Sequence, residues 1–268
     1  MLTNYHTHCN FCDGSSTPEE VVLSALNKGF AAIGFSCHGG FASLKEMKYK
    51  KIDLDAYRKE IARLQEKYKK DIQIYCGIEE DDISWIERDR YRYMIGSVHY
   101  FAKDGKYLSI DGSDTHFVNC LKAFGGDPLT LAENYYRIFC DYIALRKPDI
   151  VGHFDLITKF EEKMPVGLMD DPAYCRLAER YLTEAVKSGS IFEINTGAIS
   201  RDWRTVAYPQ ENLLYVLKKL DAPIMVNADS HHADTIDCFF EETKAMLREI
   251  GFRKSVVLYN DEFQKVDL

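Results

Sequence analysis

Short apolar segments of strand length alternate with amphipathic segments of helix length through nearly the whole of this 268-residue chain. The apolar runs predict strands at residues 2–5, 31–36, 71–76, 93–100, 149–152, 190–194 and 223–227. The periodic segments between them predict helices at residues 53–70, 128–146, 172–187, 210–220 and 235–250. This alternation indicates an α/β fold with a parallel sheet. Seven or eight such units fit a (β/α) barrel, expected here as one domain over residues 1–268.

An open, doubly wound sheet is the alternative architecture for the same alternation. The Gly-x-Gly-x-x-Gly fingerprint that often accompanies its dinucleotide-binding form is absent from the sequence. Thr17 and Pro18, followed by two glutamates, are typical of a helix start, because the hydroxyl can cap the helix and acidic residues favour its N-terminus. We also expect a β-hairpin within residues 102–115 and a last short strand at residues 254–259.

Charge and composition exclude several classes of function. The formal net charge is −8, from 34 basic and 42 acidic residues, whereas a constitutive nucleic-acid binder normally carries a basic surface. No apolar run is long enough for a membrane helix, and the first residues lack the basic start and apolar core of a signal peptide. We therefore expect a cytoplasmic enzyme with a small-molecule substrate and with neither nucleic acid nor membrane as a partner. The oligomeric state stays open.

The chain contains eight cysteines, and at this size without a secretion signal they are expected to stay reduced. Cys9-x-x-Cys12 has a spacing found in redox and zinc sites. No second such pair completes a zinc site, and a redox pair normally opens a helix. The favoured interpretation is therefore a pair of reduced, partly buried thiols.

Seven of the eight histidines stand at or just after the predicted end of a strand. In a parallel α/β fold these ends meet at one rim, which is where active sites form. The eighth, His116, falls in a polar loop and is expected to be a structural or surface residue. The ligand-type residues that follow the predicted strands are His6, His8, Asp13, His38, Glu79, His99, His153, Asp229, His231 and His232.

Such a cluster indicates bound metal. His6 and His8 are separated by one residue, so along an extended strand both side chains point to the same side and can ligate one ion. Asp229 and His231 repeat that spacing, and Glu79 offers two oxygens that could bridge two ions. Imidazole together with carboxylate suits Zn²⁺, Fe²⁺ or Mn²⁺. A single histidine at a strand end is more often hydrogen-bonded than metal-bound, but the joint pattern predicts a site for several ions.

With these motifs the sequence resembles the PHP family, named for polymerase and histidinol phosphatase, from His6 to His232. The resemblance implies a distorted seven-stranded (β/α) barrel with three divalent metal ions. It implies that one ion is held by His6, His8, Glu79 and Asp229. It implies that a second ion is held by Glu79, His99 and His153, and that Glu79 bridges the two ions. The third would be held by Asp13, His38 and His231.

Residues 96–99, 152–160 and 193–196, the last followed by Arg201, resemble the histidinol-phosphatase branch of that family. This resemblance implies a metal-dependent phosphomonoesterase of histidine biosynthesis that hydrolyses L-histidinol phosphate by attack of a metal-bound hydroxide on phosphorus. The chain departs from the family pattern at two places. Cys37 precedes His38 where the family usually has aspartate, and the spacing from Asn195 to Arg201 is irregular.

Further residues are expected to contact the substrate. Arg201 is expected to bind phosphate, with Arg204 as its competitor for that role. Asp155 and His232 are expected at the rim, either to protonate the leaving oxygen or as hydrogen-bond partners of the ligand histidines. An acidic rim would suit a cationic molecule. The other residues expected at the substrate are Asn195, Glu80 and Asp81.

Three other functions stay open. A phosphoesterase of the same family could act on a nucleotide or another small phosphomonoester, because the acidic charge argues only against a long polyanion. Amidohydrolases also open with His-x-His, but their barrels typically use a carboxylated lysine where Glu79 stands here. The third function is that of a metal-binding protein without catalytic activity. The expected open rim and the presence of an arginine suited to bind phosphate disfavour it.

Overall fold

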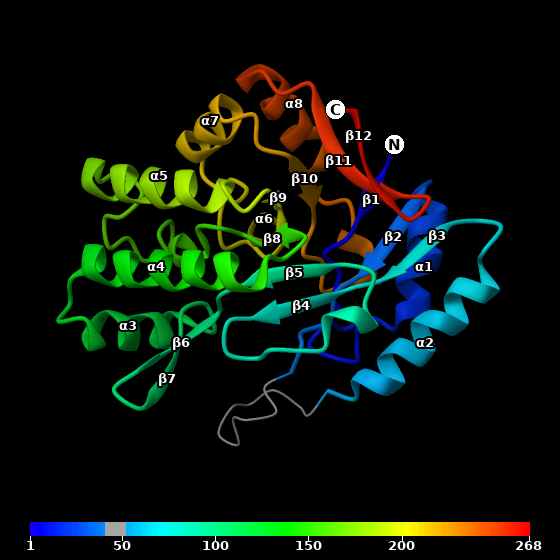
Figure 1. The fold of residues 1–268 in the computed structure, drawn as a ribbon, viewed down its shortest axis with the longest axis horizontal. Coiled ribbons are helices and arrows are strands. Elements are labelled where there is room, and N and C mark those ends of the chain that lie inside the picture. Colours follow the sequence, from blue (N-terminus) through cyan, green and yellow to red (C-terminus); the bar gives the residue numbers. More distant parts are fainter. Residues whose placement is uncertain (41–51) are drawn as a thin grey trace.

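The computed structural model describes residues 1–40 and 52–268, and its central strands form two sheets (Figure 1). The strands are β1 (Thr3–Asn4), β2 (Ala32–Phe35), β3 (Gln73–Cys76), β4 (Ile78–Asp81), β5 (Met94–Ser97), β8 (Ile150–Val151), β9 (Ile191–Asn195) and β10 (Ile224–Asn227). The first sheet has the order β1-β2-β3 and the second the order β10-β9-β8-β5-β4. Every neighbouring pair is parallel, which confirms the predicted α/β fold.

The two sheets adjoin at both of their edges. Beyond β1 and β10, Thr7 and Ser230 form an isolated parallel bridge, and beyond β2, His38 forms another with Glu79 of β4. Only Gly77 separates β3 from β4. One stretch of extended chain therefore pairs with β2 in its first half and with β5 in its second half.

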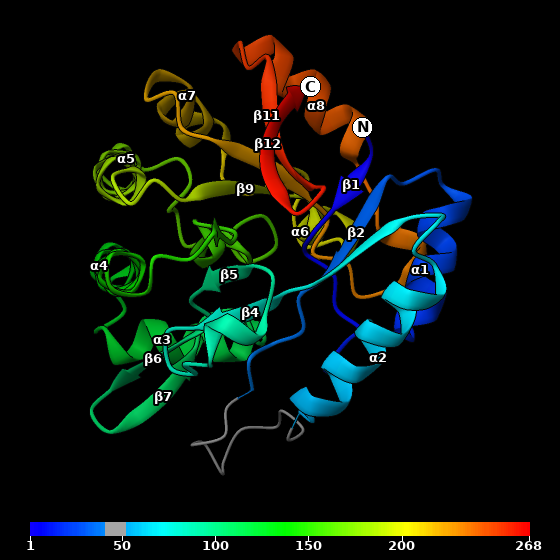
Figure 2. The same cartoon turned by 45° about the vertical axis from the view of Figure 1, so that its right-hand side comes forward.

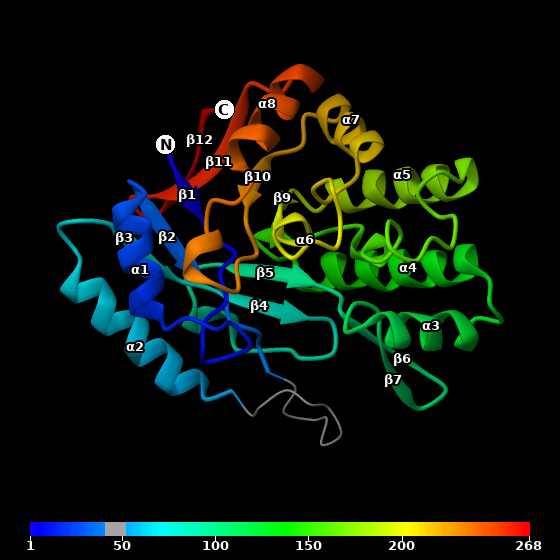
Figure 3. The same ribbon diagram turned by 180° about the vertical axis from the view of Figure 1, so that it is seen from behind.

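Helices surround these strands (Figure 2). The helices are α1 (Pro18–Asn27), α2 (Leu54–Lys67), α3 (Asp114–Ala123), α4 (Pro128–Arg146), α5 (Pro172–Val186), α6 (Gly197–Ser200), α7 (Glu211–Lys219) and α8 (Phe240–Ile250). α1 and α2 lie on one side of the molecule and α3, α4 and α5 on the other, as the view from behind also shows (Figure 3). No helix in the described part of the chain combines the length and apolar character needed to cross a bilayer.

The apolar faces of the helices form the core with the strands. Phe139 of α4, Leu182 of α5 and Leu213 of α7 are buried in one cluster with Phe192 of β9. A second cluster lies between α1, α2 and the first sheet. Both clusters lie between the helices and the sides of the strands. The carboxyl ends of the strands can therefore carry polar side chains.

The packing of Tyr93 across Gly77 determines how β3 continues into β4. A Cβ atom at position 77 would lie 2.2–2.5 Å from carbon atoms of the buried Tyr93 ring. The Tyr93 hydroxyl donates a hydrogen bond to the Tyr5 carbonyl oxygen at 2.5 Å and also lies 3.0 Å from that of Phe35. Glycine is therefore required at position 77 for the ring to reach the backbone that follows β1 and ends β2.

Several local predictions differ from the structure. The sequence places Glu79 after a strand, whereas it lies within β4 because the chain stays extended past Gly77. The strand predicted at residues 93–100 ends at Ser97. The expected hairpin is present slightly earlier, as the antiparallel pair β6 (Tyr100–Lys103) and β7 (Lys106–Ser109). His116, expected in a loop, lies in the first turn of α3, whose N-terminus is capped by Ser113.

Near the N-terminus the structure confirms the predicted helix cap, and near the C-terminus it adds a partner to the predicted last strand. The Thr17 side chain accepts a hydrogen bond from the Glu20 backbone N–H, and the Glu20 carboxylate accepts one from that of Thr17, so the helix start is as predicted. The predicted last strand β11 (Lys254–Tyr259) pairs with a further antiparallel strand, β12 (Glu262–Asp267). The helix predicted from residue 235 begins only at residue 240, after the 3₁₀ turn η3 (Ala233–Thr235).

We expect Gly77→Ala to lower the free energy of unfolding by about 1–3 kcal/mol, because the added methyl group overpacks the Tyr93 ring. Urea denaturation would measure the loss. In a Tyr93→Leu background the same substitution should cost clearly less, since the ring is gone. Equal costs in the two backgrounds would show that another contact requires the glycine.

Candidate metal centre

Among residues 1–40 and 52–268, nine histidine and carboxylate side chains converge at the carboxyl ends of the parallel strands. Their ligand atoms form four overlapping groups, and within each group all the atoms lie within 4.8 Å of one another. Glu79 belongs to β4, and the others lie in segments that follow β1, β2, β5, β8 and β10. The structure thus brings together all the residues expected to bind metal, namely His6, His8, Asp13, His38, Glu79, His99, His153, Asp229 and His231.

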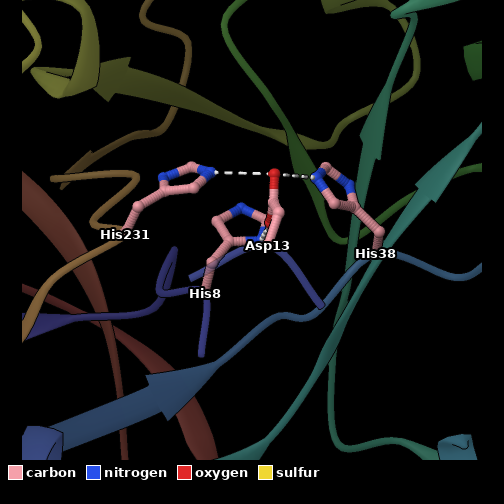
Figure 4. Close-up of side chains that lie close together, drawn as sticks. All are labelled: His8, Asp13, His38 and His231. Carbon is pink, nitrogen blue, oxygen red and sulfur yellow. Dashed lines mark ion pairs between the residues drawn. The ribbon is translucent and has the colours of Figure 1, made fainter. Parts of the chain in front are cut away.

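One group is built around Asp13 (Figure 4). Asp13 Oδ2 lies 3.3 Å from His231 Nε2 and 3.5 Å from His38 Nε2. Asp13 Oδ1 lies 3.5 Å from His8 Nδ1. Ligand atoms that share one tetrahedral ion at about 2.0–2.2 Å lie roughly 3–3.6 Å apart. The spacing of these atoms therefore fits a shared metal ion.

Glu79 belongs to two of the other three groups. Its side chain is almost fully buried, and Oε1 accepts a hydrogen bond from Ser97 Oγ at 2.7 Å. The two carboxylate oxygens can face different ions, because each has its own set of imidazole neighbours. Those nitrogen neighbours lie 3.0 Å away in His38, 3.4 Å in His6 and in His8, 3.2 Å in His153 and 3.5 Å in His99.

Asp229 completes the centre beside β1. Its Oδ1 lies 3.3 Å from His8 Nε2 and 3.6 Å from His6 Nε2. Its Oδ2 accepts a hydrogen bond from Arg201 at 2.9 Å. The backbone of Asp229 has a φ of 46°, in the left-handed region that is uncommon for residues other than glycine. Such strained residues cluster at functional sites, where the surrounding structure holds them in place.

Among the buried side-chain atoms of the centre without a hydrogen-bond partner are His6 Nε2 and Glu79 Oε2. Leaving a buried polar atom unpaired costs about 1–3 kcal/mol, and coordination to a metal ion would satisfy both atoms. The ligand spacing, the imidazole and carboxylate donors and these unpaired atoms all fit divalent ions such as Zn²⁺, Fe²⁺ or Mn²⁺. The residues therefore form a site for several metal ions.

Opposite charges stabilise one another in the centre. Burial opposes protonation of His6, but Glu193, Glu79 and Asp229 hold its pKa well above the usual value. Burial also opposes ionisation of Glu79, but the charges of neighbouring histidines hold the pKa of this carboxyl well below its usual range. For His8, burial and the nearby His38 disfavour the charged form, yet Cys12 and Asp229 raise the pKa to about 9. Without metal, the centre thus retains protons on several imidazoles.

Two further carboxylates orient the ligand histidines. Glu193 Oε1 lies 2.7 Å from His6 Nδ1, and Glu193 Oε2 accepts a hydrogen bond from the His153 backbone N–H. Asp81 Oδ2 lies 3.0 Å from His99 Nδ1 and accepts a hydrogen bond from its backbone N–H. Such partners fix the tautomer and the ring orientation of a metal-binding histidine. Asp81, expected at the substrate, thus lies behind His99 instead.

Two other predicted residues, Glu80 and Asn195, lie away from the cavity at the centre. Glu80 is fully buried and forms a bidentate ion pair with Arg146, because successive side chains of β4 point to opposite faces. The Asn195 side chain accepts a hydrogen bond from the Gly197 backbone and donates one to Glu193. These contacts correct the expectation that Glu80 and Asn195 bind substrate.

Asp155 and His232, the two expected proton donors, are also placed elsewhere. Asp155 is fully buried, and its Oδ2 accepts a hydrogen bond from the Gln210 backbone N–H at 2.8 Å. His232 has a side chain 54% exposed and accepts a hydrogen bond from the Asp234 backbone N–H at the start of η3. Neither lines the cavity, so the expectation that both lie at the rim of the active site needs correction.

Of the two competing arginines, Arg201 reaches the centre. Besides its bond to Asp229, its guanidinium lies 2.8 Å from His231 Nδ1, and it lines the cavity. Arg204 is buried outside the cavity, where it donates a hydrogen bond to Thr158 Oγ1 at 2.7 Å and lies over the Tyr208 ring. The structure therefore separates two residues that sequence spacing left equivalent.

The cavity, about 250 Å³ in volume, also contains residues that sequence reasoning missed. Lys159 Nζ lies 3.2 Å from Asp111 Oδ2, while Asp111 Oδ1 is buried without a hydrogen-bond partner. Burial opposes ionisation of Asp111, but Lys159 and nearby histidines lower its pKa. Both residues, like Trp203, lie on loops and turns that strand periodicity does not reveal. The signal in the sequence for Lys159 was its place in residues 152–160, the segment that resembles the histidinol-phosphatase branch.

Fold and site together define an α/β protein with a multinuclear metal centre at the carboxyl ends of its parallel strands. The PHP domain matches residues 4–197, more than half of the chain. The chain therefore belongs to the PHP family.

Relatives with curated names align over most of the chain. The sequence is 28% identical to "Probable histidinol-phosphatase" of Schizosaccharomyces pombe, covering 94% of this chain and 87% of the relative. It is 25% identical to histidinol-phosphatase of Bacillus subtilis, covering 88% and 96%. Among solved structures, histidinol phosphate phosphatase of Lactococcus lactis, complexed with zinc, L-histidinol and phosphate, has a TM-score of 0.74 at 20% identity over 98% of both chains. This structural similarity shows a shared fold.

We expect metal binding to release protons at neutral pH. His6, His38 and His99 have raised pKa values in the metal-free centre, so they carry protons that an incoming ion must displace. Apparent affinity should consequently rise with pH from neutral towards about 9, where His8 also loses its proton. Calorimetric titration of Zn²⁺ in buffers of different ionisation enthalpy would count the protons. An affinity that stays constant over this range would contradict the charge network.

Proposed function

We propose that the chain is a metal-dependent phosphomonoesterase that hydrolyses L-histidinol phosphate to L-histidinol and phosphate. The observation that carries the proposal is one cavity lined by histidine and carboxylate ligands together with the cations Arg201 and Lys159. Metal ligands alone would suit many hydrolases, but cations beside them favour an anionic substrate group. The names of relatives that align along nearly the whole chain support the same substrate.

Three divalent ions would be held by the ligand groups that the structure brings together. The group around Asp13 would hold one, and the two oxygens of Glu79 would be shared between the others. When bound, such ions supply the activation of water and the neutralisation of phosphoryl charge that hydrolysis of a phosphate ester needs. The ligands would need no large movement, because their atoms already have the spacing of a metal site.

The residues around the ligands would bind and orient the substrate. Arg201 presents a planar guanidinium to the cavity and can donate hydrogen bonds to phosphate oxygens. Lys159 adds a second cation to the lining of the same cavity. The unpaired Oδ1 of Asp111 can accept a hydrogen bond from a cationic part of the substrate, such as an ammonium group. The cavity thus offers separate partners for the anionic and the cationic ends of one molecule.

We also propose that the two sheets form one distorted seven-stranded barrel within a single domain over residues 1–268. The bridge between Thr7 and Ser230 supports closure on one side, and the continuous stretch through Gly77 supports it on the other. With β3 and β4 taken as one strand, the order around the ring is β1, β2, β3–β4, β5, β8, β9 and β10. The cytoplasmic location expected from the sequence stays a prediction.

A phosphate-release assay tests the function directly. Metal-loaded protein should release phosphate from L-histidinol phosphate in preference to nucleotides and sugar phosphates, and should not hydrolyse amides. His8→Ala should lose both metal and activity, because His8 contributes to two ligand groups. His116→Ala, in α3 and outside those groups, is the matched control and should retain both. A nucleotide as the preferred substrate would replace the proposed substrate while leaving the phosphatase class intact.

We expect Arg201→Ala to raise KM for the phosphomonoester about tenfold or more, because it removes a charged hydrogen-bond donor from the cavity. Some metal should be lost as well, since Arg201 also holds Asp229. Steady-state kinetics at saturating metal would separate the two effects. Arg180→Ala, which removes an exposed arginine on α5, should change neither value. An unchanged KM in Arg201→Ala would indicate that Lys159, and not Arg201, contacts the phosphate group.

A further inference from the structure

Three cysteines form a compact cluster beside the metal centre. Cys37 Sγ lies 2.9 Å from Cys12 Sγ and 3.2 Å from Cys9 Sγ. Cys9 and Cys37 are fully buried, whereas Cys12 is partly exposed. The cluster unites the Cys9-x-x-Cys12 pair with the residue that replaces the usual aspartate before His38. None of these thiols lines the cavity, so the proposed hydrolysis does not use them.

Each of these cysteines is the sequence neighbour of a ligand in the Asp13 group. Cys9 follows His8, Cys12 precedes Asp13, and Cys37 precedes His38. Cys12 Sγ also lies 3.5 Å from His8 Nδ1, the same nitrogen that lies 3.5 Å from Asp13 Oδ1. The backbone that positions three of the four ligands drawn in Figure 4 therefore also positions the thiols.

We propose that Cys12 and Cys37 are a redox-active pair, and that their oxidation to a disulfide weakens metal binding by His8, Asp13, His38 and His231. Cys12 is a partly exposed residue, unlike Cys9 and Cys37, and its sulfur lies 2.9 Å from that of Cys37. Cys9 is fully buried, its sulfur lies 3.2 Å from Cys37 Sγ, and it stays reduced because an oxidant cannot reach it. This inference goes beyond the proposed function and is independent of which phosphomonoester is hydrolysed.

A peroxide serves as the oxidant. The Cys12 sulfur attacks one peroxide oxygen, the O–O bond breaks, and Cys12 sulfenic acid and one water are formed. The Cys37 sulfur then attacks the Cys12 sulfur, so that the S–S bond forms and the S–O bond breaks. The second oxygen leaves as water with the proton of the Cys37 thiol. Two thiols and one hydrogen peroxide thus give one disulfide and two waters, and a dithiol reductant reverses the change.

The new bond changes the positions of the ligands. A disulfide has an S–S distance of about 2.05 Å, so the two sulfurs must approach from 2.9 Å. The loop that carries Asp13 and the segment that carries His38 are drawn together by this movement. Ligand distances in metal sites lie within about 0.2 Å of their standard values, so this movement displaces the ligands from the metal-bound arrangement. Oxidation also removes the 3.5 Å hydrogen bond between Cys12 Sγ and His8 Nδ1 that helps to orient this ligand. Both effects disfavour the metal-bound arrangement.

The coupling is reciprocal. If the disulfide lowers metal affinity by some factor, bound metal disfavours the disulfide by the same factor. Metal-loaded protein should therefore need more peroxide than metal-free protein to reach the same extent of oxidation. This protection provides a readout that does not involve the phosphatase reaction.

The test is to treat the full chain, reduced and then freed of reductant, with hydrogen peroxide in the presence and absence of Zn²⁺. Free thiols are then alkylated, and peptides are mapped by mass spectrometry without reduction. We expect a Cys12–Cys37 linked peptide that forms at least several-fold more readily without Zn²⁺ and disappears on treatment with dithiothreitol. Elemental analysis after desalting should show about one ion fewer per chain in the oxidised protein.

Two variants complete the design. Cys12→Ser should form no linked peptide and should keep its metal after peroxide treatment, whereas Cys140→Ser, on α4 and remote from the cluster, should behave as the unchanged chain does. A link between Cys9 and Cys37, or oxidation of Cys12 without any link, would overturn the assignment. A Cys12–Cys37 link that leaves the metal content unchanged would overturn the coupling. Because these readouts need no substrate, failure of the proposed phosphatase activity would leave them unaffected.

Discussion

The contact between one carboxylate, Glu79, and five histidines is the interaction on which this site depends. Glu79 is almost completely buried, and a carboxylate is stable at that depth only when opposite charges or metal ions surround it. The histidines follow four different strands, β1, β2, β5 and β8. Balancing the charge of this one side chain therefore requires four strand ends to be held together, and the packing of Tyr93 on Gly77 helps to hold them.

The centre has a rigid part and a more exposed part. His6 and Glu79 are buried, and Glu193 fixes the His6 ring from behind. Asp13 and His231, by contrast, have side chains 37% and 27% exposed and lie on loops. Fewer contacts restrain loop residues, so a change in the neighbouring backbone can alter their positions more easily. The three thiols are sequence neighbours of His8, Asp13 and His38, so the proposed redox change would act first on the group built around Asp13.

Much of the fold and of the ligand set could be predicted from the sequence. The period of two along a strand identified His6 and His8 as a pair, and the alternation of segments indicated parallel strands. The alternation alone does not support the prediction that Glu79 binds metal and Glu80 binds substrate, because both are carboxylates in one buried strand. The structure separates them by face: Glu79 meets the histidines, while Glu80 pairs with Arg146 on α4. That partner lies 66 residues away in the chain.

The sequence by itself determined the alternation of strands and helices and the chemical type of the centre, because residue periodicity and ligand chemistry are local properties. Only the tertiary structure decided which polar residues share the cavity. It brought in Asp111 and Lys159 and placed Asp155 and His232 outside. The physical reason is that access to the cavity depends on burial and on distances between residues far apart in the chain. Pairing between strands and the packing of side chains set those distances, and neither can be read from a local pattern.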